Sequence, residues 1–265
     1  MMKRDEEMRP EHKTEMKARA RNIRLTVSYD GTNYHGFQRQ RPPVVAVQNV
    51  LEEKLEAVFG DSIELAASGR TDAGVHAYGQ VVNFFTDGHI PVERVPRAVN
   101  GLLPSDIVVL EAAEADPDFS ARHSAKSKTY IYRIQQGLLP CPFTRNYAWH
   151  VGRPLDVAAM REALGYVHGT HDFTSFRASG GAPMSPVRTM YREEIREIPG
   201  DMLEVVLHGN GFLYHMVRNI IGTLANVGLW RISPAGFRNI LEARDRRKAS
   251  PTAPAQGLYL FSVEY

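Results

Sequence analysis

The chain has 265 residues, enough for one large domain or two modest ones, and 43% of them are hydrophobic, enough to build a core. Its formal net charge of +2 does not by itself indicate nucleic-acid binding, and the single cysteine, Cys141, excludes an internal disulfide and fits a reducing compartment. No apolar run approaches the roughly 18–20 residues of a membrane span, and no secretory signal is visible. We therefore predict a cytoplasmic protein with no membrane contact.

The first half of the chain predicts alternating strands and helices after a charged extension. Residues 1–22 mix charges densely with few apolar anchors, which is typical of a flexible segment. Apolar residues at helical spacing follow Pro42 and Pro43 and predict the first helix. The predicted strands are 23–29, 63–68, 77–86 and 107–113, and the predicted helices are 44–59 and 92–103.

The second half repeats the same plan. Its predicted strands are 127–135, 188–198, 202–208 and 258–264, and its predicted helices are 156–168 and 213–228. Each half approximates β-α-β-β-α-β, the split βαβ unit. The predicted fold class is α+β, with two such halves forming one extended, mainly antiparallel sheet, helices on one face and a central cleft. The predicted units are 23–115 and 116–265, with residues 116–119 as the crossover.

One carboxylate stands in a glycine-rich connection between two of these strands. Residues 68–77 read SGRTDAGVHA, with Asp72 at the centre and Arg70 two residues before it. Gly69 and Gly74 allow the backbone to approach a ligand closely. An acid beside an arginine on a tight loop suits chemistry on an anionic polymer. The alternative is an Asx-turn, in which Asp72 bonds its own backbone.

The helix predicted at 213–228 suggests where Arg218 points. Its apolar stripe consists of Met216, Val217, Ile220, Ile221, Leu224 and Val227. Arg218 lies off that stripe, beside Gly222 and Ala225, and such small neighbours let another element approach. We therefore predict that Arg218 faces an interface or a cleft; the alternative is a surface arginine lying along the helix.

Two tyrosines share one face of the strand predicted at 127–135. Tyr130 and Tyr132 alternate with Thr129 and Ile131, so both rings project to the same side. Such pairs are core residues more often than ligand platforms, although a tyrosine ring can also stack on a displaced base.

The histidines raise the possibility of a metal site. His168, His171 and Asp172 are close in sequence and His215 lies downstream, but no HExxH, paired CxxC or third ligand at a recognisable spacing accompanies them. There is also no P-loop and no dinucleotide fingerprint in the required context. We therefore predict no metal and no cofactor.

The string GRTDAGVHA at residues 69–77 resembles the active-site motif of the tRNA pseudouridine synthase A (TruA) family. Other segments match this family in the expected order over roughly residues 23 to 265. They are YDGT at 29–32, GFQRQ at 36–40, KTYIY at 128–132, HDFTSF at 171–176, GFLY at 211–214, MVRN at 216–219 and APAQGL at 253–258.

This resemblance implies the pseudouridine synthase fold, with two ferredoxin-like, or RRM-like, halves, and an isomerase that converts uridine to pseudouridine in the anticodon stem-loop of tRNA. It implies that Asp72 is catalytic and pairs with Arg218, which would keep the carboxylate ionised. It further implies that Tyr130 stacks on the base and that Arg70 helps to hold the nucleotide out of its stack. The implied partners are tRNA and a second copy of the chain, in a homodimer, with no cofactor.

The sequence leaves open the chemical role of Asp72 and two alternative functions. The sequence does not distinguish a nucleophilic Asp72 from one that removes a sugar proton. A non-catalytic RNA-binding module is the main alternative function, because split βαβ sheets often bind single strands through aromatic residues. Basic residues such as Arg122, Lys126, Lys128 and Arg133 could serve either function, or simply form a solvated face. A metal hydrolase that uses the histidines as ligands is the second alternative function.

Overall fold

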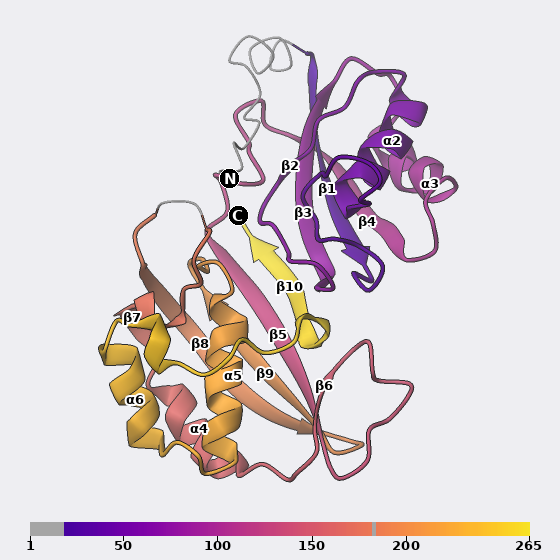
Figure 1. Ribbon diagram of the computed structural model, residues 1–265. Helices are drawn as coiled ribbons and strands as arrows, with labels where there is room; N and C mark the ends of the chain where they lie inside the picture. Colours follow the sequence, from indigo (N-terminus) through magenta and orange to yellow (C-terminus); the bar gives the residue numbers. More distant parts are fainter. Residues whose placement is uncertain (1–18, 182–183) are drawn as a thin grey trace.

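The computed structural model describes residues 19–181 and 184–265, so most of the predicted extension lies outside the described residues (Figure 1). The first half contains β1 (Arg21–Tyr29), α2 (Val47–Phe59), β2 (Ala66–Ala67), β3 (His76–Thr86), η1 (Val92–Arg94), α3 (Val95–Asn100) and β4 (Ile107–Ala115). The second half contains β5 (Ser127–Gln136), β6 (Trp149–Val151), α4 (Val157–Gly165), β7 (Gly169–Asp172), η2 (Thr174–Phe176), β8 (Val187–Ile198), β9 (Met202–Gly209), α5 (Met216–Gly228), α6 (Pro234–Glu242), η3 (Arg246–Lys248), η4 (Ala255–Gly257) and β10 (Leu258–Glu264).

The strands form one large sheet, in the order β4-β1-β3-β10-β5-β9-β8-β7, with β2 paired to β3 and β6 paired to β5. The first half contributes β4-β1-β3-β2 and the second contributes β10-β5-β9-β8, so both halves place their fourth, first, third and second strands side by side. All neighbours are antiparallel except β3 with β10 and β5 with β6. The predicted α+β class, with its mainly antiparallel sheet, is confirmed.

The two halves join where β10 meets β3. Strand β2 has two residues and pairs only with the middle of β3, which leaves the start of β3 available. β10 pairs in parallel with that start, at His76 and Ala77. The strand predicted at 63–68 is shorter because the Leu65 N–H donates to the Glu52 carboxylate (2.9 Å) instead of to a neighbouring strand. The loop 68–75 therefore lies at the junction of the halves.

The helices cover one face of this sheet. Leu258 and Leu260, two residues apart on β10, point to the same side, and they belong to the cores of the second and the first half respectively. Figure 1 shows α2 and α3 beside the first half and α4, α5 and α6 beside the second. Tyr259 points to the opposite face, where it packs with Ile131 and Val206. Helices on a single face were predicted, and this arrangement is confirmed, whereas the division into units 23–115 and 116–265 stays a prediction.

The crossover predicted at 116–119 is anchored by two buried asparagines. The Asn22 side-chain amide donates to the carbonyls of Asp116 (2.8 Å) and Phe119 (3.0 Å), and the Asn83 amide donates to Asn22 (2.9 Å). The backbone N–H of Ala121 donates to Asn83 (2.8 Å). These bonds tie the start of the second half to β1 and β3.

Several elements differ from the predictions. β6, β7 and α6 were not predicted, although Ser233 caps α6 by accepting from the Gly236 N–H (3.0 Å). The helix predicted at 92–103 divides into η1 and α3, and the strand predicted from residue 23 begins at Arg21. α5 begins at Met216 and not at 213, because His215 has a left-handed backbone (φ 57°) that cannot continue a helix. None of the helices in the described ranges has the length and apolar character needed to cross a membrane.

Helix α5 is buried on nearly every side, including the side that carries its small residues. A Cβ at Gly222 would lie 2.1 Å from the Pro251 carbonyl oxygen, so the segment 251–253 runs directly against the helix. The Ala253 N–H donates to the Arg218 carbonyl (3.1 Å) in the same contact. The Arg218 Nε also donates to the Ala253 carbonyl across this contact (2.8 Å), so the prediction that Arg218 faces an interface is confirmed.

We expect Gly222→Ala to destabilise the protein by about 1–3 kcal/mol, because the added methyl group meets backbone that cannot rotate away. The matched control is Gly165→Ala in α4, where a Cβ meets nothing within 4 Å and alanine favours the helix by roughly 0.5–1 kcal/mol. Urea unfolding measures both. Equal stabilities for the two variants would contradict close packing between α5 and segment 251–253.

Candidate active site

The loop 68–75 that carries Asp72 is supported from behind by segment 31–37. The Phe37 N–H donates to the Thr71 carbonyl (3.0 Å), and the Gly74 N–H donates to the Tyr34 carbonyl (3.3 Å). Gly36 has a φ of 89°, and a Cβ there would lie 2.7 Å from the Thr71 oxygen, so this close approach requires glycine. Segment 31–37 therefore positions the backbone of the Asp72 loop.

The Asp72 carboxylate points to the start of α5. Its Oδ2 accepts from the Arg218 Nη1 (2.9 Å) and lies 3.2 Å from the His215 Nε2. Both contacts use the same oxygen, and within the described residues Oδ1 has no hydrogen-bond partner. The side chain is 24% exposed, so Oδ1 is not sealed inside the protein. The Asx-turn alternative is excluded, since the carboxylate bonds these side chains and not its own backbone.

Arg218 is held at two points. Its Nε donates to the Ala253 carbonyl (2.8 Å) while its Nη1 donates to Asp72, and the side chain is only 14% exposed. A planar guanidinium with two fixed contacts has little rotational freedom. Arg218 therefore links the loop of the first half, the helix of the second half and segment 251–253.

Burial of the Asp72 carboxylate would raise its pKa, but the hydrogen bonds and positive charges of His215 and Arg218 outweigh burial and lower the pKa below its ordinary value. Asp72 is therefore ionised at neutral pH. A carboxylate that is to act as a nucleophile or as a base requires this charge state.

Tyr130 lies where the two cores meet, and its ring packs edge-on against Phe212, with 4.9 Å between centroids. Burial raises the pKa of the Tyr130 phenol, and the nearby Tyr29 and Asp72 raise it further. The phenol therefore keeps its proton across the physiological range. Its hydroxyl has no hydrogen-bond partner within the described residues, so it is available as a donor.

Arg70 differs from the other predicted site residues. Its side chain is exposed and forms no ion pair with Asp72, or with any other residue in the described ranges. The structure thus brings Asp72, Arg218 and Tyr130 together and leaves the Arg70 guanidinium at the surface, two residues from the carboxylate. Its predicted contact with a substrate stays a prediction.

His215 contacts Asp72 although sequence reasoning considered it only as a possible metal ligand. Its ring packs against Tyr214 in a tilted arrangement, with 4.0 Å between centroids, and its Nε2 lies beside the carboxylate. The available signal was its position three residues before Arg218 at a helix start, where such residues share a side. The two histidines considered with it bond other groups: His168 contacts Glu193 (2.9 Å) and His171 contacts the His168 carbonyl (2.6 Å). Among residues 19–181 and 184–265, no group of three potential ligands is arranged around a metal position.

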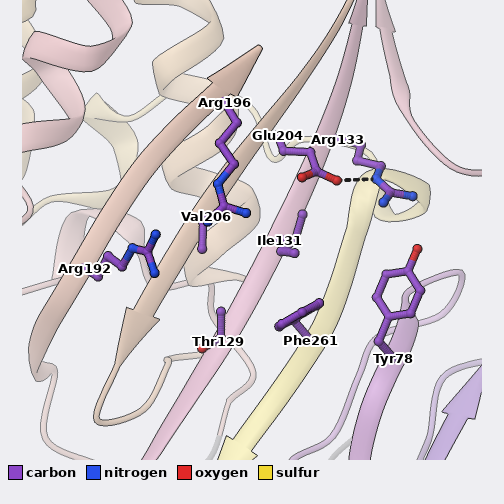
Figure 2. Close-up of a pocket in the computed structure, with 9 residues that line it drawn as sticks. All are labelled: Tyr78, Thr129, Ile131, Arg133, Arg192, Arg196, Glu204, Val206 and Phe261. Carbon is purple, nitrogen blue, oxygen red and sulfur yellow. Dashed lines mark hydrogen bonds and ion pairs between the residues drawn. The ribbon is translucent and has the colours of Figure 1, made fainter. Parts of the chain in front are cut away.

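The opposite, open face of the sheet has a hollow of its own. Figure 2 shows Arg133 paired with Glu204 (2.9 Å) at one side of it and Tyr78 and Phe261 nearby. The other lining residues are Thr129, Ile131, Arg192, Arg196 and Val206. Asp72, Tyr130 and Arg218 do not line this hollow, because they belong to the face that the helices cover.

We expect His215→Phe to raise the pKa of Asp72, because one donor to Oδ2 is lost and only Arg218 then opposes the rise in pKa that burial causes. The phenylalanine ring can still pack against Tyr214. A carbon-13 NMR titration of labelled aspartates measures this pKa, with Asp72→Asn to assign the signal. His171→Phe is the matched control, since His171 bonds the His168 carbonyl and not Asp72. An unchanged Asp72 pKa in His215→Phe would show that the contact carries no electrostatic weight.

Comparison of the sequence with known proteins identifies a family. The family model described as tRNA pseudouridine synthase matches residues 25–124 and 163–265. Curated proteins called tRNA pseudouridine synthase A are 46% identical in a Thermoanaerobacter species (92% of this chain, 100% of the relative) and 49% identical in Geobacillus kaustophilus (92% and 94%). A crystal structure of an archaeal box H/ACA ribonucleoprotein complex matches 75% of this chain and 44% of that chain, with 14% identity and a TM-score of 0.35. From the family model and these relatives, the chain belongs to the tRNA pseudouridine synthase family.

Proposed function

We propose that the protein isomerises uridine to pseudouridine in the anticodon stem-loop of tRNA, with Asp72 as the catalytic residue. The observation that carries this proposal is the Asp72 carboxylate, which is ionised and held through Oδ2 by Arg218 and His215, while Oδ1 has no partner among residues 19–181 and 184–265. The family and the names of the relatives support tRNA as the substrate.

The reaction needs no cofactor to balance. The N1–C1′ bond of uridine breaks, the base turns over, and a C5–C1′ bond forms. The proton leaves C5 and a proton is bound at N1, so substrate and product have the same atoms. Asp72 promotes the first step through Oδ1, either by attack on the sugar carbon or by removal of a sugar proton. Because Arg218 also weakens the carboxylate as a base, catalysis depends on holding Oδ1 against the sugar.

Access to the sugar requires the uridine to leave its stack, which costs a few kcal/mol. Tyr130 offers a ring for the displaced base, and stacking on an aromatic ring contributes about 1–3 kcal/mol. The exposed Arg70 takes the place of the base in the RNA stack. With its raised pKa, the Tyr130 phenol begins the reaction as a hydrogen-bond donor.

The protein acts as a homodimer in the cytoplasm. The single cysteine supports this location, because a chain without an internal disulfide fits a reducing compartment. The support for the dimer is an apolar segment between β5 and β6. Leu138, Leu139 and Phe143 are 84%, 78% and 87% exposed there, and exposed apolar clusters of this kind are typical of interfaces.

Release of tritium from tRNA labelled at uridine C5 tests the proposed activity. We expect wild type to release label, and Asp72→Asn to bind tRNA but to release label on the order of 10⁴-fold more slowly, because the reacting carboxylate is gone. Asp118→Asn, which changes an exposed acid in the crossover, is the matched control and should match wild type.

The same assay distinguishes the proposed enzyme from a non-catalytic RNA-binding module, which would bind tRNA without release of label by wild type or any variant. A wild-type protein that releases no label from several uridine-containing tRNAs would overturn the proposed function.

For the dimer, we expect Phe143→Ser to shift the mass in solution from two chains toward one, because it removes the most exposed ring of the apolar segment. Light scattering after size exclusion measures this mass. Trp230→Ser, at a ring that is 63% exposed near the end of α5, is the control and should leave the mass unchanged. A wild-type mass of one chain would contradict the dimer.

A further inference from the structure

A half-buried lysine lies beside the candidate active site, and the reaction described above does not use it. Lys128 and Tyr130 are two residues apart on β5 and project from the same face. The Lys128 Nζ donates to the carbonyl of Ser68, the first residue of the loop that carries Asp72. A Cβ at Gly69 would lie 3.1 Å from that Nζ and 4.0 Å from the Tyr130 hydroxyl, so the ammonium and the phenol converge on one glycine.

The charges around Lys128 have the same sign as its own. Burial, together with the smaller effect of the charges of Arg122 and Arg188, lowers the pKa of Lys128 to about 8. Within the described residues no carboxylate pairs with Lys128. The Arg188 guanidinium donates to the backbone carbonyls of Ser185 and Val187, and it also has no acidic partner in these ranges.

Arg188 belongs to the same neighbourhood as Tyr130. Its Nε lies 3.5 Å from the position of a Cβ on Gly211. Gly211 precedes Phe212, whose ring packs against Tyr130. Lys128 on β5 therefore lies beside Tyr130, on whose ring the displaced base is proposed to stack, and Arg188 on β8 lies close enough for its charge to act on Lys128.

A contact with the Ser68 carbonyl alone does not account for a lysine here. A neutral donor would satisfy that carbonyl without placing an unpaired charge in a half-buried position among other cations. The missing component is an anion. Because the neighbouring site is proposed to receive a nucleotide, the anion of matching chemistry is a phosphodiester of the RNA backbone.

We propose that Lys128, together with Arg188 and Arg122, binds one backbone phosphate of the RNA immediately beside the displaced uridine. This site deepens the proposed function and rests on it. The bound phosphate supplies the negative charge that the protein lacks there, and it fixes the displaced nucleotide between Tyr130 and the loop that carries Asp72.

The salt dependence of tRNA binding tests this site. We expect Lys128→Gln to reduce the slope of log affinity against log salt by about one, because one fewer phosphate is neutralised. Lys128→Arg should keep the slope. Lys54→Gln is the matched control, since Lys54 is a partly buried lysine that already pairs with Glu53 (2.6 Å) and should leave the slope unchanged. An unchanged slope in Lys128→Gln would overturn the proposal.

A second measurement separates phosphate binding from support of the loop. A neutral methylphosphonate is placed, one position at a time, at the phosphates that flank the target uridine. We expect one position to weaken binding to wild type about 10-fold and to have almost no effect on binding to Lys128→Gln. Equal losses for both proteins at every position would show that Lys128 only supports the Ser68 carbonyl.

Tritium release by wild type distinguishes failure of the phosphate site from failure of the proposed function. If wild type releases label but Lys128→Gln shows neither the slope change nor the coupling, the phosphate site fails and the proposed function stands. If wild type releases no label, the proposed function fails independently of the binding results.

Discussion

The contact between Arg218 and Asp72 joins parts of the chain that are distant in sequence. One guanidinium bonds the carboxylate of a loop in the first half and the Ala253 carbonyl that precedes β10, while its own backbone belongs to α5. A half-buried carboxylate without this cation would have a raised pKa and a freer rotamer. The lowered pKa and the orientation of Asp72 therefore both depend on the contact between the two halves.

The sheet explains why this contact occurs where it does. Both halves use the same strand order, but β2 is so short that it leaves the start of β3 unpaired for β10. The loop 68–75 connects β2 to β3, so it emerges at the strand pair that joins the halves. α5 belongs to the other side of this junction, and its Arg218 side chain reaches the loop directly. A single shortened strand thus sets the position of the candidate active site.

The electrostatics of the site are those of one anion among several cations. Arg218 and His215 hold Asp72 through one oxygen, the exposed Arg70 belongs to the same loop, and the half-buried Lys128 contacts the first residue of that loop. The carboxylate is therefore already paired, whereas Lys128 and Arg70 have no acidic partner in the described residues. An anionic polymer is the ligand that such a surface favours, because its phosphates neutralise these charges without competing for Asp72.

The sequence by itself determined the features that depend on local pattern. The period of α5 separated Arg218 from the apolar stripe, and the glycine-rich run between two strands placed Asp72 on a loop, because side-chain direction follows directly from helix and strand periods. Only the tertiary structure decided that His215 shares Oδ2 with Arg218, that β10 and not β2 pairs with the start of β3, and that Lys128 lies among cations. These features arise from contacts between segments far apart in the chain, and neither spacing nor composition encodes such distances.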